Sequence, residues 1–256
     1  MTTIRIAPTL EAMEAIYRLP RTGGPASPRF QRYVELAETH FGLPAYNPMA
    51  GDHALETVER LIAADAEMVV RQAGEAVAAR CHFQGDITLA VVLAAPGLWT
   101  DRLATEVHYR TSAPRVPGSG MVFHWTREPV EPAVLTREAA TETVRVMWTS
   151  EHGPATTVAA ILAREGMAYA IASSPFGSPD AAEERAVSDG VEILAESTAP
   201  ADMASILYGD PAADALGWQP LGIADRAGYR WAVARAEQLL ATQGPATAWR
   251  RPAPVR

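Results

Sequence analysis

A nearly continuous apolar run lies about a third of the way along the chain, Ile87-Thr88-Leu89-Ala90-Val91-Val92-Leu93. Its β-branched residues favour a strand, and the lack of polar alternation indicates burial on both faces. Pro96-Gly97 ends the segment, which is too short to span a bilayer. A strand covered on both faces needs helices on each side of its sheet. The run therefore predicts a strand over Asp86–Ala95 within an α/β fold.

Further strand-like segments suggest that this strand belongs to a sheet. Met121–Thr126 is flanked by glycines and a proline and predicts a second strand. In the C-terminal half, Met167–Ala172 and Val191–Ala195 are apolar, and each is followed by a loop and a helix-like segment, as in parallel βαβ units. We predict an α/β fold with a mainly parallel sheet flanked by helices and an extra helical region at the N-terminus. An α+β fold is the alternative.

Apolar residues spaced three and four apart, between capping residues and Gly or Pro stops, predict the helices. Residues 51–77 are open to two interpretations: one long helix, which we favour, or a helix ending near Ala64 and a strand over Glu67–Arg71. We expect one domain over residues 1–248, helical over about residues 1–80, and a flexible Pro/Arg-rich tail over 249–256. The remaining predicted helices span residues 9–19, 28–41, 136–150, 157–166, 179–190, 200–207 and 225–240.

The chain has no lysine, and all 22 of its basic residues are arginine. Pyridoxal phosphate enzymes and Schiff-base enzymes need an amine nucleophile, so both classes are excluded. P-loop and kinase phosphoryl transfer is excluded for the same reason, since both machines use a lysine. Arginine stays charged and can clamp an anion, but it cannot act as an amine base.

The formal net charge of −8 argues against nucleic acid as a partner, because phosphate binding needs a basic face. The sequence also shows no membrane span and no signal peptide, and its one cysteine cannot form an internal disulfide. We expect a cytoplasmic protein. Six tryptophans favour core or subunit-interface packing, which is compatible with a homo-oligomer.

Ligands of open parallel sheets bind beyond the carboxyl ends of the strands, which directs attention to the loops that follow the predicted strands. Hydroxyl groups at a helix N-terminus suit a carboxylate or phosphate, and an arginine there can add a bidentate clamp. Two of these loops supply the predicted substrate-binding residues Trp99, Thr100, Arg102, Ser173, Ser174 and Ser178.

Glu106-Val107-His108-Tyr109-Arg110 is the densest polar cluster near the clearest strand. If residues 104–111 form a strand, Glu106, His108 and Arg110 share one face. If they form a helix that is capped by Thr100 or Asp101, His108 lies instead near Asp101, Ala104 and Thr105. In both cases we predict His108 as the general acid–base group, oriented by Glu106 or Asp101.

The sequence favours an enzyme that acts on a small organic anion by general acid–base chemistry, most simply a lyase, isomerase or hydrolase. No dinucleotide fingerprint or nucleophile elbow is present, and we predict no cofactor. One alternative is a divalent-metal enzyme with Glu106, His108 and His124 as ligands. The other alternative is a non-catalytic protein that binds a small ligand or takes part in an assembly.

Overall fold

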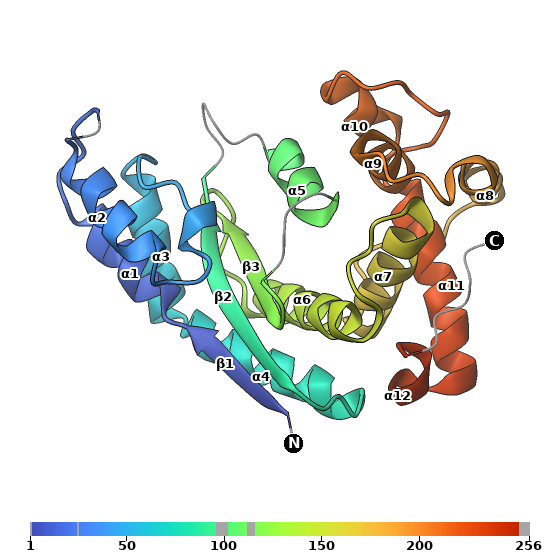
Figure 1. The fold of residues 1–256 in the computed structure, drawn as a ribbon, viewed down its shortest axis with the longest axis horizontal. Helices are drawn as coiled ribbons and strands as arrows, with labels where there is room; N and C mark the ends of the chain where they lie inside the picture. The colour runs from blue at the N-terminus through green and yellow to red at the C-terminus, as the bar shows by residue number, and fades with distance from the viewer. Residues whose placement is uncertain (1, 25, 96–101, 112–115, 251–256) are drawn as a thin grey trace. The chain divides into compact units, whose positions relative to one another are not determined.

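The computed structural model describes residues 2–24, 26–95, 102–111 and 116–250. Within these ranges, no helix is both long and apolar enough to cross a membrane. Residue contacts divide the chain into two compact units (Figure 1). Unit 1 holds Met1–Ala78, Gln84–Asp101 and Gly118–Thr143, and unit 2 holds Ala79–Phe83, Arg102–Pro117 and Val144–Arg256.

Unit 1 is built on a three-stranded parallel sheet in the order β1-β2-β3. The central strand β2 (Asp86–Ala94) is buried over nearly all its length, which confirms the prediction from its apolar run. The predicted strand at 121–126 is β3 (Ser119–Trp125), and the sheet is parallel as expected. The edge strand β1 (Thr3–Ala7) was not predicted, because it is short and only one of its residues is fully buried.

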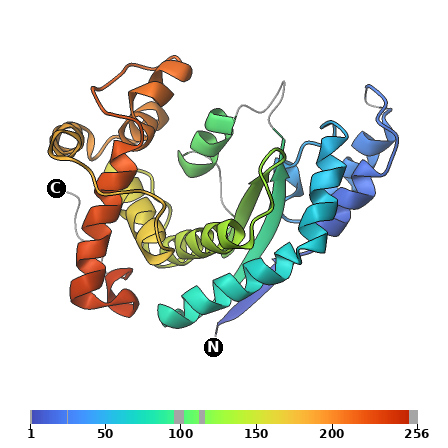
Figure 2. The same ribbon diagram turned by 180° about the vertical axis from the view of Figure 1, so that it is seen from behind.

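Helices and a loop cover both faces of this sheet, as the apolar run requires. On one face, a side chain in place of Gly74 would meet Leu89 of β2 at 3.3 Å, so the helix holding Gly74 packs closely there (Figure 2). On the other face, a Cβ on Gly42 would come within 2.8 Å of Ala90, and Gly42 also has a φ of +90°. The helices of this unit are α1 (Thr9–Tyr17), α2 (Pro28–Ala37), η1 (Leu43–Ala45), α3 (His53–Ala63), α4 (Ala66–Arg80) up to Ala78, and α6 (Pro132–His152) up to Thr143.

The segment 51–77 contains two helices, so the favoured single helix is wrong. The alternative is right about a helix end near Ala64 but wrong about the strand over Glu67–Arg71, which is helical. α3 ends at Ala63 and α4 begins at Ala66, with Asp65 between them at a φ of +51°. Aspartate tolerates this left-handed conformation better than most residues, so the chain can turn here without a glycine. Apolar spacing continues across the turn because both helices bury one face in the same core.

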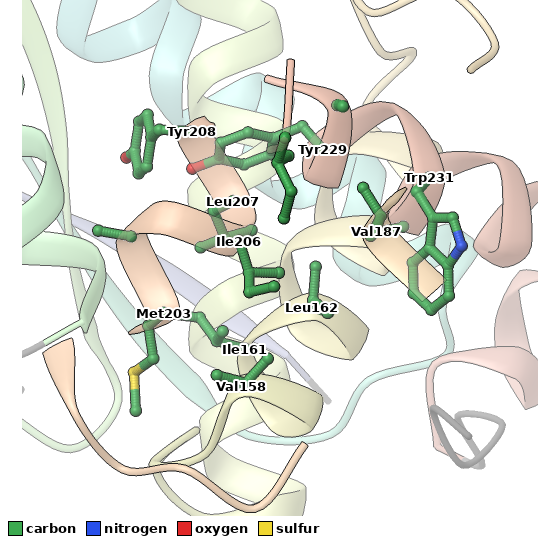
Figure 3. Close-up of a cluster of buried hydrophobic side chains, with 14 of the residues drawn as sticks. Val158, Ile161, Leu162, Val187, Met203, Ile206, Leu207, Tyr208, Tyr229 and Trp231 are labelled. Atoms are coloured by element: carbon green, nitrogen blue, oxygen red, sulfur yellow. The ribbon is translucent and has the colours of Figure 1, made fainter. Parts of the chain in front are cut away.

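The elements that the structure describes in unit 2 are all helices. Its core joins α7, α9 and α11 through apolar side chains such as Ile161, Ile206 and Trp231 (Figure 3). Glycines permit the close crossings: a Cβ on Gly166 would lie 2.4 Å from the Ala232 carbonyl oxygen. The helices are α5 (Arg102–Thr111), the rest of α6, α7 (Val158–Ile171), α8 (Ala181–Leu194), α9 (Pro200–Tyr208), α10 (Asp210–Ala215), α11 (Ala227–Gln243) and α12 (Pro245–Ala248).

The two strands predicted in the C-terminal half are wrong, because Met167–Ala172 ends α7 and Val191–Ala195 ends α8. α7 is buried on nearly every side, and such a helix is as continuously apolar as a buried strand. Gly166 and Gly190, which suggested helix ends, lie inside helices. A Cβ on Gly190 would come within 2.7 Å of a neighbouring side chain, so its role is close packing. The sheet is consequently smaller than predicted.

The predicted flexible tail begins too early, since Trp249 is completely buried in unit 2. Its indole Nε1–H donates to the Cys81 carbonyl oxygen at 2.9 Å, and its ring lies edge-on to Phe83 at 5.9 Å between centroids. Residues 251–256, the rest of that predicted tail, lie outside the described residues.

Candidate functional site

Residues 104–111 are helical, which decides between the two forms predicted for the Glu106–His108 segment. Glu106 forms an ion pair with Arg102 one turn away, with 2.9 Å between Oε1 and Nε. Residues two apart on a helix do not face each other, so this carboxylate is directed along α5 and not toward His108. His108 itself is exposed. Trp99, Thr100 and Asp101, the other residues predicted here, lie outside the described residues.

The predicted serine loop connects two helices and does not follow a strand. Ser173 comes after the end of α7 and has a φ of +66°, and the Ser174 hydroxyl accepts a hydrogen bond from the backbone N–H two residues on. Asp180, not Ser178, caps α8, and Glu183 completes a capping box with it. Ser173 and Ser174 therefore lie near the carbonyl end of a helix, where the dipole disfavours the anion predicted to bind there.

His124 lies at the carboxyl end of β3 in unit 1, and it is only 3% exposed. From the sequence it is predicted solely as a third metal ligand beside Glu106 and His108, which belong to unit 2. Across the residues that the structure describes, no three side chains of the types His, Cys, Asp and Glu are grouped so that they could hold a metal ion. The metal alternative therefore gains no support. What His124 can do depends on the groups around its ring.

The His124 ring has one anchored and one open nitrogen. A backbone hydrogen bond with Glu128 raises the His124 pKa, which identifies the Glu128 carbonyl as the acceptor of a ring N–H. Nε2 is buried and has no partner among the described residues, so the anchored nitrogen is Nδ1. Burial lowers the His124 pKa more than this bond and the Glu128 charge raise it. Burial therefore favours the neutral ring, in which Nε2 carries a bare lone pair.

Thr126 directly follows β3, two residues after His124, and provides a second open polar atom at this end of the strand. Its Oγ1 is buried and, in the described part of the chain, has no hydrogen-bond partner. Its backbone is well held: the N–H donates to the Ala94 carbonyl at 3.0 Å, and the carbonyl accepts from Thr57 Oγ1 at 3.0 Å. The open hydroxyl thus belongs to a residue whose backbone N–H and carbonyl are both hydrogen-bonded within unit 1.

Arg60 on α3 brings a guanidinium to this edge of unit 1. Its Nη2 donates to Thr57 Oγ1 at 2.9 Å, its side chain is exposed, and its charge contributes to lowering the His124 pKa. We call His124, Thr126, Thr57 and Arg60 the sheet-edge cluster. It combines a neutral imidazole, a buried hydroxyl and a surface cation at the carboxyl end of a parallel strand, the usual ligand position in such sheets.

A different cluster of charges lies buried in unit 2. Glu165 accepts from Nε and Nη2 of Arg145 at 2.7–3.0 Å and from Nε of Arg164 at 2.9 Å, and all three side chains are nearly inaccessible. Burial alone would raise the Glu165 pKa, but these guanidinium groups, with that of Arg110, hold it well below its usual range. Both carboxylate oxygens have donors, so this network is structural.

Sequence reasoning missed the sheet-edge cluster although one signal was present. Ligands of parallel sheets bind beyond strand ends, but the loops chosen from the sequence follow β2 and two segments that are helical. The end of β3 was not among them. His124 and Thr126 lie there, two residues apart. Arg60 and Thr57 could not be added from the sequence, because they precede His124 by more than 60 residues.

Comparison with protein-family models, with curated proteins and with solved structures finds no match. A functional assignment therefore depends on the chemistry of the residues themselves.

Proposed function

We propose that this chain is an enzyme that acts on a small organic anion by general acid–base chemistry, with His124 as the base. A lyase, isomerase or hydrolase fits this description. The observation that carries the proposal is the His124 ring, which is buried and anchored at Nδ1, while the described residues offer no partner to Nε2. Buried polar atoms are rarely left without a partner, and exceptions often belong to functional sites.

The geometry supports proton transfer at a defined atom. The Glu128 carbonyl fixes the ring orientation and the tautomer, which leaves Nε2 as the acceptor. A lowered pKa keeps this acceptor unprotonated at neutral pH, as a general base requires. Because the chain contains no lysine, histidine and carboxylates are its main candidates for such transfer near pH 7.

Arg60 and Thr126 supply the remaining groups that an anionic substrate needs. The guanidinium would pair with the anionic group, and the hydroxyl would donate a hydrogen bond where negative charge develops. Both residues belong to unit 1 together with His124, so the proposal depends on one unit only. The earlier candidate His108 is less well supported, because it is exposed and its neighbour Glu106 pairs with Arg102.

The test compares His124→Asn with His108→Asn. Asparagine can keep the donor at the Nδ1 position while it removes the Nε2 acceptor, so the fold should persist. Turnover of a panel of small carboxylates, followed by proton NMR, should fall about a hundredfold or more in His124→Asn and stay unchanged in His108→Asn. The reverse result would assign the base to α5. Binding without turnover by the wild-type protein would favour the non-catalytic alternative.

A second measurement needs no substrate. Nitrogen-15 NMR of the histidine rings should show His124 neutral at pH 7, protonated at Nδ1 and titrating below the usual histidine range. An imidazolium at position 124 at pH 7 would exclude its role as a base.

A further inference from the structure

We propose that the sheet-edge cluster selects a small hydroxycarboxylate, with the substrate hydroxyl on His124 Nε2 and the carboxylate at Arg60 and Thr126. This inference rests on the proposed function and extends it to a substrate class. Its basis is the hydrogen-bonding character of the two open atoms, which differ in what they demand of a ligand.

Nε2 of His124 needs a hydrogen-bond donor from the ligand. Its partner nitrogen already donates to the Glu128 carbonyl, so Nε2 of the neutral ring can only accept. A carboxylate has no proton to give and would direct its own lone pairs at that of Nε2. A ligand that carries a carboxylate alone therefore leaves this buried acceptor unsatisfied, which costs binding energy.

Arg60 can only donate and needs an acceptor, and the Thr126 hydroxyl can donate to the same one. The Thr126 hydroxyl can donate one hydrogen bond, and the described part of the chain gives it no partner. Arg60 uses Nε for the Glu56 carbonyl and Nη2 for Thr57, so its Nη1 remains available to an anion at the exposed rim. An anion that contacts both groups approaches from the solvent side of Arg60.

The distance between His124 and Thr126 limits the size of a ligand that contacts both. His124 lies in β3 and Thr126 directly follows the strand, so their Cα atoms, two residues apart, are separated by at most about 7 Å. One small molecule with a donor and an anionic group on neighbouring carbons can bridge that distance. A hydroxyl attached next to, or one carbon away from, a carboxylate meets both demands.

An ammonium group could also donate to Nε2, but its charge would be disfavoured. Burial opposes a positive charge on the His124 ring despite the nearby Glu128 carboxylate, and the same burial would oppose an ammonium in contact with that ring. A hydroxyl donates without bringing a charge. The chemistry of the cluster therefore favours a hydroxy acid over an amino acid.

The experiment measures binding for matched acids by titration calorimetry: lactate, propionate and alanine, and then malate, succinate and aspartate. Wild-type protein should bind each hydroxy acid about tenfold or more tightly than the acid that lacks the hydroxyl, and more tightly than the amino acid. His124→Asn should lose the preference for the hydroxyl. Arg60→Gln should weaken hydroxy and unsubstituted acids by a similar factor and keep the preference.

Three results would overturn the substrate class: no binding of any of the six acids, equal binding within each set, or a preference that persists in His124→Asn. Tighter binding of alanine and aspartate would replace the hydroxyl by an ammonium and overturn it as well. Each of these binding results can occur while His124 is neutral at pH 7 and required for turnover. A failure of the substrate class is thus distinguishable from a failure of the proposed base.

Discussion

Two threonine-to-valine substitutions in unit 1 should change stability in opposite directions, although the chemical change is the same. Thr126 is 3% exposed and Thr57 is fully buried, and valine has nearly the shape of threonine at both positions. The difference lies in what each hydroxyl contacts. The prediction therefore tests whether the Thr126 hydroxyl is without a partner.

For Thr126→Val we expect a gain of about 1–2 kcal/mol in the free energy of unfolding. A buried hydroxyl without a partner costs about 1–3 kcal/mol, and a methyl group at the same place does not carry that cost. Some of the gain will be lost to imperfect packing of the new methyl group.

For Thr57→Val we expect a loss of about 2 kcal/mol. The Thr57 hydroxyl lies 2.9 Å from the His53 carbonyl and 3.0 Å from the Thr126 carbonyl, and it accepts from Arg60 Nη2 at 2.9 Å. One hydroxyl proton serves one carbonyl at a time, so two hydrogen bonds disappear, each worth about 1 kcal/mol. The two variants should thus differ by about 3 kcal/mol.

Native-state hydrogen exchange of the β3 amides reports this difference within unit 1. Since about 1.4 kcal/mol corresponds to a factor of ten, protection factors at the central amides should differ by about a hundredfold between the variants. If Thr126→Val loses as much stability as Thr57→Val, the Thr126 hydroxyl has a partner in solution. The sheet-edge cluster would then lose one of its two open atoms.

Further predictions concern unit 2. Glu165→Gln should cost about 3–5 kcal/mol, because it leaves the Arg145 and Arg164 guanidinium groups buried without their counter-ion, while Glu106→Gln at the partly exposed pair should stay within about 0.5 kcal/mol. Equal chemical denaturation curves for the two variants would contradict the network's structural role. The Glu165 pKa is lower in the folded than in the unfolded chain, so the ionised carboxylate stabilises the fold fully above the ordinary pKa of 4.5. This contribution to the free energy of unfolding should fade as the pH falls below 4.5. An acid titration of stability should show the loss in the wild type but not in Glu165→Gln. Burial raises the Cys81 pKa to about 11, so a disulfide reagent at pH 8 should label the folded protein far more slowly than the unfolded chain, and fast labelling of the folded protein would refute this.

The buried strand was predictable because its signal is local. An apolar run of β-branched residues before Pro96-Gly97 has few alternatives to a strand covered on both faces, and the structure has that strand as the centre of a parallel sheet. Most helix positions were also predictable, since capping residues and spacing act within a few residues. The Thr157 cap, for example, accepts from the N–H of Ala160.

The false strands arose because apolar content reports burial and not backbone conformation. Met167–Ala172 is continuously apolar because α7 packs against neighbours on nearly every side. Gly166 suggested a helix end from sequence, yet its lack of a side chain serves the contact with α11. This contact of Gly166 with Ala232 joins residues more than 60 positions apart, and no local pattern contains it.

The sequence by itself determined the chemistry that the chain can use and the central element of its sheet. Arginine is its only permanent cation, and the apolar run must lie inside a layered fold. Only the tertiary structure distinguished the candidate histidines: His108 is exposed, whereas His124 is buried, hydrogen-bonded to the backbone of Glu128 and close enough to Arg60 for its charge to act on it. The physical reason is that burial and hydrogen-bond partners set the state of an imidazole, and both come from residues that are distant in the chain.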